Sequence, residues 1–387
     1  MQKLFYENIH LTDFSATVAS CEPAADGKQY AILLDATAFF PEEGGQSADK
    51  GTLNGLPVLD VQIKNDLIYH YISEPLAVGS TVTGHVDWEQ RFDFMQQHSG
   101  EHIVSGLVHS RFGYNNVGFH LSNNEVTLDF NGELTPEDLR EIEFRANEVI
   151  YQNLPVEITY PSKAELDSLS YRSKIEIEGQ VRIVTIPGVD VCACCAPHVE
   201  TTGAIGMIKI TSCQSHRGGV RLTILCGKRA LLDYNKKQDS VSAVSVALSA
   251  KQDLIADAVL KLKEDIQRQQ ERINALQANY LELSISTLPA PSESESPVLF
   301  VDKMDTIAIR NTVNTLTERY SGYCGVFSDD EKNGYQFIVG SQHKDCKELA
   351  QIFRTELGAK CGGNTPMIQG SITASKEQIA ACLKKIN

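Results

Sequence analysis

Two short groups of metal-ligand residues, almost a hundred positions apart, constrain the fold of this chain more than any other feature. His98 and His102 are four residues apart, so on a helix both rings leave the same face, one turn apart. Cys194 and His198 repeat this spacing, and thiolate with imidazole is the ligand combination that favours zinc. A fold that brings the two groups together would hold one zinc ion with these four side chains.

Neither group identifies a metal site alone, because a surface pair of histidines or a buried free cysteine would give the same pattern. The second group is unusually dense, however, and it follows a β-rich run at 181–191. Packing alone does not account for this density, which favours a zinc site divided between two segments. The residues of the second group are Asp190, Cys192, Cys194, Cys195 and His198.

Composition sets the broad class of the protein. The chain has 387 residues, of which 42% are hydrophobic and 22% charged, enough for two or three domains with a hydrophobic core. The N-terminus lacks an apolar signal core, and no uninterrupted apolar run approaches about 18 residues, so we expect a cytoplasmic protein without a membrane span. The ten cysteines are scattered except at 192–195, so most are expected to be reduced thiols.

The net charge of −15 argues against a polyanionic partner, since phosphate binding draws on Lys and Arg. One stretch, 203–237, differs from the rest, because it carries seven Lys or Arg residues against a single Asp. Such a stretch is either a solvated face or a local surface for a nucleic acid. Arg217 and Arg221 lie at its centre and are the candidate nucleic-acid contacts if the second alternative holds.

The first ninety residues are expected to form a small β-barrel domain, with strands at 16–20, 30–40, 58–64, 67–72 and 81–87. One of these strands runs into the paired glycines Gly44 and Gly45, which are followed by Gln46. Paired glycines let a ligand approach the backbone closely, and the Gln46 amide offers both a donor and an acceptor. A plain loop is the alternative interpretation of this segment.

Residues 91–239 are expected to form an α+β domain that contains the zinc site. A helical pattern follows Trp88 and carries both histidines, and a second helix begins at Thr135, a capping residue followed by a proline. Strands are predicted at 156–160, 181–185, 207–211 and 220–226. The zinc ligands would then come from one helix and from the end of a later strand.

A heptad pattern predicts a long coiled-coil helix within residues 240–288. Apolar residues from Ile255 to Leu283 alternate in steps of four and three, with Gln269 the only amide among them. Soluble monomers avoid such an exposed stripe, so we expect a homodimer through this helix and the C-terminal domain; the alternative is that the helix folds back on its own domain. A linker rich in Pro, Ser and Glu at 289–297 leads to a compact α/β domain at 298–387. Glycines suited to close backbone approach stand in this last domain at Gly362, Gly363 and Gly370.

Several of these motifs together resemble a known family. The segment from Phe39 to Gln46, the two metal-ligand groups and the segment from Thr202 to Gly206 resemble the editing domain of alanyl-tRNA synthetases. The whole chain resembles more closely the long form of the AlaX alanyl-tRNA editing proteins. The heptad helix and the glycine-rich tail are similar to that family's C-terminal DHHA1 domain, so the resemblance covers nearly the full length.

The resemblance implies a zinc-dependent deacylase that hydrolyses the ester of a wrong amino acid, serine or in some members glycine, on tRNA(Ala). It implies that His98, His102, Cys194 and His198 bind Zn2+. Gln46 and Thr37 would face the aminoacyl end, and Thr37 would hydrogen-bond a serine hydroxyl. Contacts with the tRNA are expected from the turn, the basic stretch and the tail, at Gly44, Gly45, Arg217, Arg221, Gly362, Gly363 and Gly370.

The chain departs from the family's motifs at three places. The usual Glu-Gly-Gly-Gly-Gln has Glu43 at its second position, which places a carboxylate beside the loop. The Gly-Gly-Thr often found between the cysteine and histidine ligands is replaced by a segment that begins with Cys195, so Cys195 or Cys192 could compete for the metal. In the tail, Ser371 occupies a position where a further glycine is common.

Alternatives remain open at the level of the sequence. Four protein ligands describe a closed structural zinc site, whereas a catalytic zinc keeps one position open. Either one ligand, His198 for example, is exchangeable, or the metal anchors the substrate and water is activated elsewhere. The chain could also be a non-catalytic zinc-containing protein that binds tRNA or a partner, or an editing enzyme for another pair such as serine on tRNA(Thr).

Overall fold

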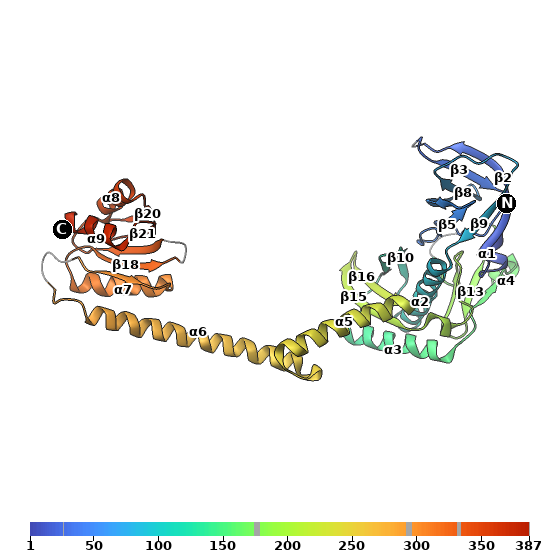
Figure 1. The fold of residues 1–387 in the computed structure, drawn as a ribbon. Helices are drawn as coiled ribbons and strands as arrows, with labels where there is room; N and C mark the ends of the chain where they lie inside the picture. Colours follow the sequence, from blue (N-terminus) through green and yellow to red (C-terminus); the bar gives the residue numbers. More distant parts are fainter. Residues whose placement is uncertain (26, 174–178, 292–295, 331–333, 387) are drawn as a thin grey trace. The chain divides into compact units, whose positions relative to one another are not determined.

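The computed structural model describes residues 1–25, 27–173, 179–291, 296–330 and 334–386 of the chain. It contains two compact units, Met1–Val241 and Ser242–Asn387. Both units mix helices with strands, which confirms the predicted α+β class (Figure 1). In the described part of the chain, every helix is too short or too polar to cross a membrane.

The first unit begins with a seven-stranded sheet that nearly closes on itself, because β6 returns to contact β8. Alternate residues of its strands face the interior; along β8, for example, Ile68, His70 and Ile72 are buried. A short α1 (Leu4–Glu7) and the parallel pair of β1 (Gln2–Lys3) and β4 (Ala36–Thr37) accompany this sheet. In spatial order the strands are β6 (Leu56–Val58), β5 (Gly51–Leu53), β9 (Thr81–Val86), β2 (Asp13–Pro23), β3 (Tyr30–Leu34), β8 (Leu67–Ile72) and β7 (Asp60–Lys64).

Helix α2 (Trp88–Phe112) runs through the interior of the same unit. Its start is capped by Asp87, whose side chain accepts a hydrogen bond from the Gln90 backbone N–H, and it ends at Gly113 in a left-handed conformation. Residues 94–106 are all buried, including seven with polar side chains. Gly106 permits the close approach of a neighbouring strand, since a Cβ there would lie 2.4 Å from the carbonyl oxygen of Val189.

A four-stranded antiparallel sheet packs against α2 and α3 (Pro136–Gln152). As predicted, α3 begins after Thr135. The Thr135 hydroxyl accepts a hydrogen bond from the Asp138 backbone N–H, and the Asp138 carboxylate accepts one from the Thr135 backbone N–H. The strands of this sheet, in spatial order, are β10 (Asn116–Leu121), β11 (Val126–Phe130), β16 (Gly219–Cys226) and β15 (Ile208–His216).

A smaller sheet carries the second ligand group to α2. It consists of β12 (Glu157–Thr159), β13 (Ile183–Ile186) and β14 (Asp190–Ala193), with α4 (Lys163–Leu166) before β13 and the 3-10 turn η1 (Thr202–Ile205) after β14. Strand β14 packs against α2 and ends directly before Cys194. The sheet therefore delivers the cysteine ligand to the helix that carries the histidines.

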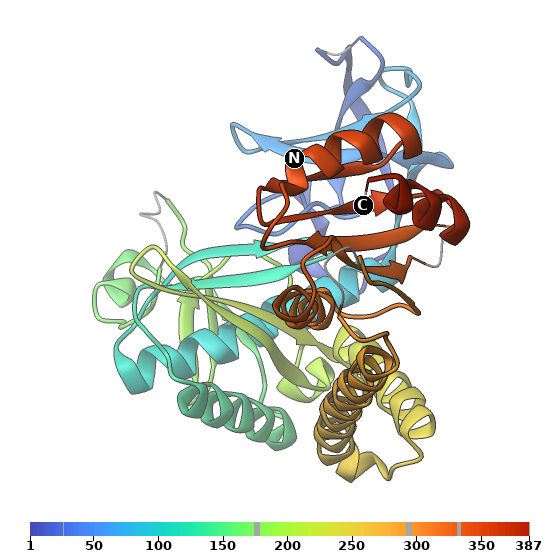
Figure 2. The same ribbon diagram turned by 90° about the vertical axis from the view of Figure 1, so that its left-hand side faces the viewer.

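The second unit is a five-stranded sheet between two helical layers (Figures 1 and 2). Helices α6 (Ile255–Ser286) and α7 (Thr306–Arg319) lie on one face, and α8 (Cys346–Leu357) and α9 (Lys376–Ile386) on the other. The predicted long helix is α6, and the end of α5 (Gly227–Leu248) and η2 (Gln252–Leu254) precede it. The predicted linker at 289–297 includes 292–295, which lie outside the described residues. The strand order is β17 (Val298–Val301), β18 (Cys324–Asp329), β19 (Tyr335–Gly340), β21 (Met367–Ile372) and β20 (Lys360–Asn364).

Candidate metal centre

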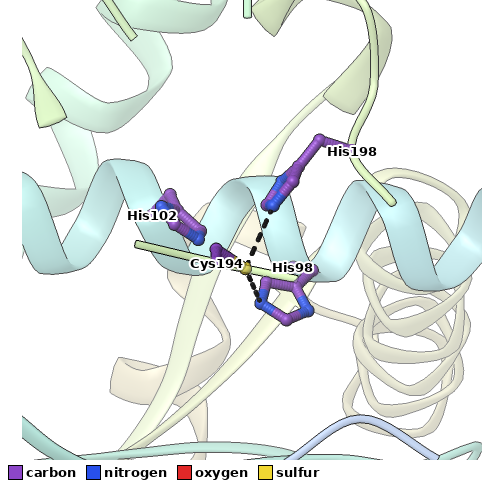
Figure 3. A group of neighbouring side chains, drawn as sticks. All are labelled: His98, His102, Cys194 and His198. Carbon is purple, nitrogen blue, oxygen red and sulfur yellow. Dashed lines mark hydrogen bonds between the residues drawn. The ribbon is translucent and has the colours of Figure 1, made fainter. Parts of the chain in front are cut away.

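The structure brings the four predicted ligands together (Figure 3). His98 and His102 project from neighbouring turns of α2, while Cys194 and His198 come from the segment after β14. The ligand atoms of the four residues all lie within 4.8 Å of one another. Cys194 Sγ lies 3.4 Å from Nε2 of His98 and 3.4 Å from Nε2 of His198. The group is buried apart from the half-buried cysteine, and it could hold a metal ion.

Two of the three imidazoles are oriented by neutral side chains. His98 Nδ1 donates to Gln46 Oε1 at 2.8 Å. His198 Nδ1 lies 3.1 Å from the hydroxyl of Ser99, a residue of α2 that also accepts a hydrogen bond from the backbone after His198. Because each Nδ1 has a partner on the protein side, Nε2 is left facing Cys194 Sγ in both residues.

A buried ion pair orients the third imidazole. His102 Nδ1 lies 2.9 Å from Asp190 Oδ2, and Arg172 donates to the two carboxylate oxygens of Asp190 at 2.7 and 2.8 Å. Burial alone would raise the pKa of Asp190, but the hydrogen bonds from His102 and Arg172 outweigh it and lower the pKa. Burial would likewise lower the pKa of His102, but Asp190 holds it well above the ordinary value. The charged carboxylate therefore fixes this ring and increases its basicity as a ligand.

The arrangement of protons in the group favours a cation at its centre. Nδ1 of His98 donates to Gln46, which leaves the lone pair of a neutral ring on Nε2, and the Cys194 thiolate offers lone pairs on Sγ at 3.4 Å from it. A bound metal ion would accept all of them.

The three neighbouring cysteines differ in charge. Burial by itself favours a neutral thiol at Cys194, but its electrostatic interactions with the imidazoles of His98 and His198 hold its pKa well below the ordinary value. Burial raises the pKa of Cys192 to about 11. Burial, together with the charge of Cys194 and the carboxylate of Glu43, also raises the pKa of Cys195. Cys194 is thus the thiolate of the cluster, while the two possible competitors are held as neutral thiols.

The glycine segment is a tight hairpin turn beside the metal group. Glu43 and Gln46 exchange backbone hydrogen bonds of 3.2 and 3.0 Å, and Gly44 and Gly45 between them have φ of 63° and 83°. A Cβ at Gly45 would lie 2.3 Å from the carbonyl oxygen of Phe119 in β10, so this position requires glycine. Gln46 is fully buried, and its Nε2 has no hydrogen-bond partner among the described residues.

Thr37 is buried inside the barrel-like sheet. Its hydroxyl accepts a hydrogen bond from the Phe39 backbone at 3.1 Å and lies 2.7 Å from His70 Nε2. Burial lowers the pKa of His70 to about 4, and its Nδ1 lies 3.2 Å from the carbonyl oxygen of Ile32. Nε2 of the neutral ring therefore accepts a hydrogen bond from the Thr37 hydroxyl, and one lone pair of Oγ1 is left for another donor. A contact between Thr37 and a serine hydroxyl stays a prediction.

The basic stretch at 203–237 is largely neutralised in space. Arg221 in β16 donates to both carboxylate oxygens of Asp129 at 2.6 and 2.7 Å, and Arg217 stands in the turn between β15 and β16. Contacts of either residue with tRNA stay predictions. The other ion pairs of this stretch join Lys209 to Glu143, Lys228 to Glu89, Arg229 to Asp93 and Lys237 to Asp233.

The glycines of the tail lie in the edge strand β20 of the second unit and in its neighbour β21. Gly362 and Gly363 in β20 line a cavity of about 410 Å³ together with Arg310 of α7. Gly370 in β21 permits close pairing, because a Cβ there would lie 2.3 Å from the carbonyl oxygen of Lys360. Strand packing explains Gly370, and binding of tRNA at the tail stays a prediction.

Sequence reasoning missed two residues that support the ligands. Ser99 lies inside the His-x-x-x-His motif, one position after His98, and nothing in the spacing shows that it reaches a histidine from another segment. Arg172 comes from an irregular stretch before β13, where no periodic pattern marks it. Both could be identified only once the tertiary structure was known.

Comparisons with known proteins agree with this architecture. Residues 181–222 match the family model described as the threonyl and alanyl tRNA synthetase second additional domain, and residues 2–90 match that of the class II (A) tRNA synthetases. The chain is 31% identical over 277 residues to the alanyl-tRNA editing protein Aarsd1 of Danio rerio, covering 68% of this chain and 67% of the relative. It is 27% identical over 399 residues to Aarsd1 of Mus musculus, covering 98% and 96%.

A longer protein also matches. The alanine–tRNA ligase of Ignicoccus hospitalis is 29% identical over 402 residues, which cover 100% of this chain but 42% of the ligase. The match to the editing protein of Mus musculus, by contrast, extends over nearly all of both chains. With the metal-ligand group and the glycine turn in place, the chain belongs to the family of alanyl-tRNA editing proteins.

Proposed function

We propose that this protein is a zinc-dependent hydrolase that removes a wrong amino acid from tRNA(Ala), serine foremost and glycine second. The observation that carries the proposal is the buried group of three imidazoles and one thiolate, together with the hydrogen bond between the Gln46 amide and His98. The relatives named as alanyl-tRNA editing proteins support the choice of tRNA(Ala).

Zinc fits the ligand group. In a tetrahedral zinc site, the usual bond lengths separate a sulfur ligand from a nitrogen ligand by about 3.6 Å. The two separations between Cys194 Sγ and an imidazole nitrogen are both 3.4 Å. Thiolate and imidazole also favour zinc over magnesium or calcium, which prefer oxygen ligands. When bound, zinc supplies Lewis acidity that polarises a carbonyl and lowers the pKa of water.

The chain's own contribution to the reaction is the placement of a hydrogen-bond donor. An aminoacyl ester is already activated, so its hydrolysis depends mainly on orientation and on stabilising the oxyanion that develops on the carbonyl oxygen. Gln46 holds His98 through Oε1, and this contact leaves its buried Nε2 without a partner among the described residues. We assign this N–H group to the substrate's carbonyl oxygen, because a buried donor without a partner is costly.

The second candidate function is a non-catalytic protein with a structural zinc. The four ligands alone do not distinguish it from the hydrolase, because four protein ligands are the usual structural set. A structural site, however, needs neither the glycine turn nor an amide with an unpaired donor beside a ligand. Gln46 therefore favours the hydrolase.

A substrate series tests the proposal. The purified chain is expected to hydrolyse Ser-tRNA(Ala) fastest, Gly-tRNA(Ala) more slowly, and Ala-tRNA(Ala) and Ser-tRNA(Thr) least. Gln46→Ala should retain the metal and lower the rate by about 100-fold, as removal of an oxyanion donor does in other enzymes. Gln267→Ala on the exposed surface of α6 is the matched control.

Two outcomes would reject the proposed function. The first is that no aminoacyl-tRNA of the series is hydrolysed faster than it hydrolyses spontaneously. The second is a preference for Ser-tRNA(Thr), which would assign the chain to another tRNA. If Gln46→Ala lost the metal together with the activity, Gln46 would be a support for His98 and not a substrate contact.

A further inference from the structure

The hairpin turn beside the metal group carries a carboxylate at a position where the family's motif has glycine. Glu43 stands directly across the turn from Gln46, since each residue's N–H donates to the other's carbonyl, at 3.2 and 3.0 Å. Side chains of such an opposed antiparallel pair leave the same face, with their Cβ atoms about 5 Å apart. The Gln46 amide contacts His98. The Glu43 side chain therefore stands beside the metal group.

A second departure from the family's motifs lies beside the first. Cys195 packs against the turn, because a Cβ at Gly44, the residue after Glu43, would lie 3.3 Å from Cys195 Sγ. The two unusual residues thus lie close together at the turn, next to the ligand Cys194.

Glu43 differs from the other carboxylates near the ligands in its exposure. Asp190 is buried and accepts hydrogen bonds from His102 and Arg172, while Glu101 is buried and accepts from Ser105 and Asn116. Glu43 is half-buried. A carboxylate has about four acceptor sites, and its partial exposure leaves Glu43 able to accept a donor from a ligand.

We propose that Glu43 binds the α-ammonium group of the aminoacyl ester and so selects substrates whose amino group is free. This inference rests on the proposed function. An aminoacyl ester carries its only positive charge one carbon from the reacting carbonyl, and a charge-assisted hydrogen bond is the strong way to recognise it. In the proposed function the metal group and the Gln46 amide serve the hydrolysis, so the hydrolysis itself does not require a carboxylate at Glu43. Glu43 therefore acts in substrate selection, and esters with a blocked amino group, such as peptidyl or N-acetyl esters, are the class that it excludes.

The test compares two substrates that differ only in that charge, Ser-tRNA(Ala) and N-acetyl-Ser-tRNA(Ala). The unaltered chain should prefer Ser-tRNA(Ala) over the N-acetyl ester by about tenfold in kcat/KM. A fully buried charged hydrogen bond would give a larger preference, but Glu43 is partly exposed. Glu43→Gln and Glu43→Gly should remove this preference, mainly through a higher KM for Ser-tRNA(Ala). Both variants should keep the metal content and the rate on the N-acetyl ester.

The neighbouring residue offers a matched control. The Glu42 carboxylate accepts a hydrogen bond of 2.8 Å from Gln62 in β7, and Glu42→Gln should leave the preference unchanged. The inference is overturned if the preference survives in both Glu43 variants, or if Glu43→Gln slows both substrates equally, which would indicate a role in the chemical step or in the fold. Hydrolysis of neither substrate by the unaltered chain would overturn the proposed function as well.

Discussion

Each histidine of the metal group depends on the residue behind its ring. Gln46, Ser99 and Asp190 occupy the Nδ1 side of the three imidazoles, and Asp190 is the only charged member of this set. A carboxylate behind a ligating imidazole fixes the tautomer and strengthens the metal–nitrogen bond. Among the three, Asp190 should therefore contribute most to metal affinity.

Replacing the charge of Asp190 tests this ranking. Asp190→Asn should weaken metal binding by about 10- to 100-fold, because the amide keeps the shape but not the charge that supports His102. Competition with a chromophoric chelator measures the affinity. Asp129→Asn serves as the control. Asp129 accepts two hydrogen bonds from Arg221 in another sheet, as Asp190 does from Arg172. An equal loss of affinity in both variants would show that the effect is one of general stability.

The ligands could be predicted from the sequence, but their supports could not. Four-residue spacing is a local property of a helix or a strand end, so His98, His102, Cys194 and His198 were identifiable without a structure. The hydrogen-bond partner of each ring comes from another segment of the chain. Gln46, for example, lies in a turn 52 residues before His98. Such pairings depend on packing, which no local pattern encodes.

At the scale of elements, strands and helices with one solvent-facing side were predicted best. Helix α3 and strands β8 and β9 alternate between buried and exposed residues and lie where the pattern predicts them. The strand predicted over 30–40 is wrong in part, because the chain breaks at Asp35, whose side chain accepts a hydrogen bond from the Thr17 backbone. Strands β10 and β11 were missed, and β10 contains Asn116 and Gly118, which have low strand propensity.

The long helix α6 presents an apolar stripe that its own unit does not cover. It packs on α7 through another face, with Leu281 and Ile285 in the shared core. We propose that the stripe pairs two chains in a parallel coiled coil, since one set of its positions holds Val or Ile apart from Tyr280 and the other mostly Leu. The exposed residues of the stripe are Val259, Leu262, Ile266, Ile273, Leu276, Tyr280 and Leu283.

Light scattering on the full chain tests the pairing. The unaltered protein should have twice the chain mass of 42.6 kDa, and Ile266→Lys with Ile273→Lys should reduce it to the monomer, because charges in the seam cannot be buried. Gln267→Lys with Asn274→Lys, one position along the helix, is the matched control and should remain dimeric. A monomeric mass for the unaltered chain would end the proposal.

At the scale of the whole molecule, a basic stretch of the sequence does not by itself predict a basic surface. The stretch 203–237 is basic along the chain, yet carboxylates from several other elements pair with most of its cations. With a net charge of −15, attraction to tRNA must therefore be local. The predicted contacts at Arg217 and Arg221 thus depend on how tRNA competes with Asp129.

The fold places a turn of the barrel-like sheet against the helix that carries the histidines. Strand β10 joins these parts, because the Leu121 N–H donates to the Gly45 carbonyl at 2.7 Å and the Phe119 ring lies 4.8 Å from the ring of His98. This junction could not be predicted from the sequence, because it is built by a missed strand. The metal-ligand group and Gln46 therefore come together only where the two parts meet.

The measurement that tests this account most directly follows metal content and hydrolysis of Ser-tRNA(Ala) on the same samples during removal by a chelator. We predict about one zinc ion per chain, hydrolysis that falls in proportion to zinc and returns when zinc is restored, and neither zinc nor hydrolysis in His98→Ala. A chain that hydrolyses Ser-tRNA(Ala) at its full rate after the zinc has been removed would contradict the account.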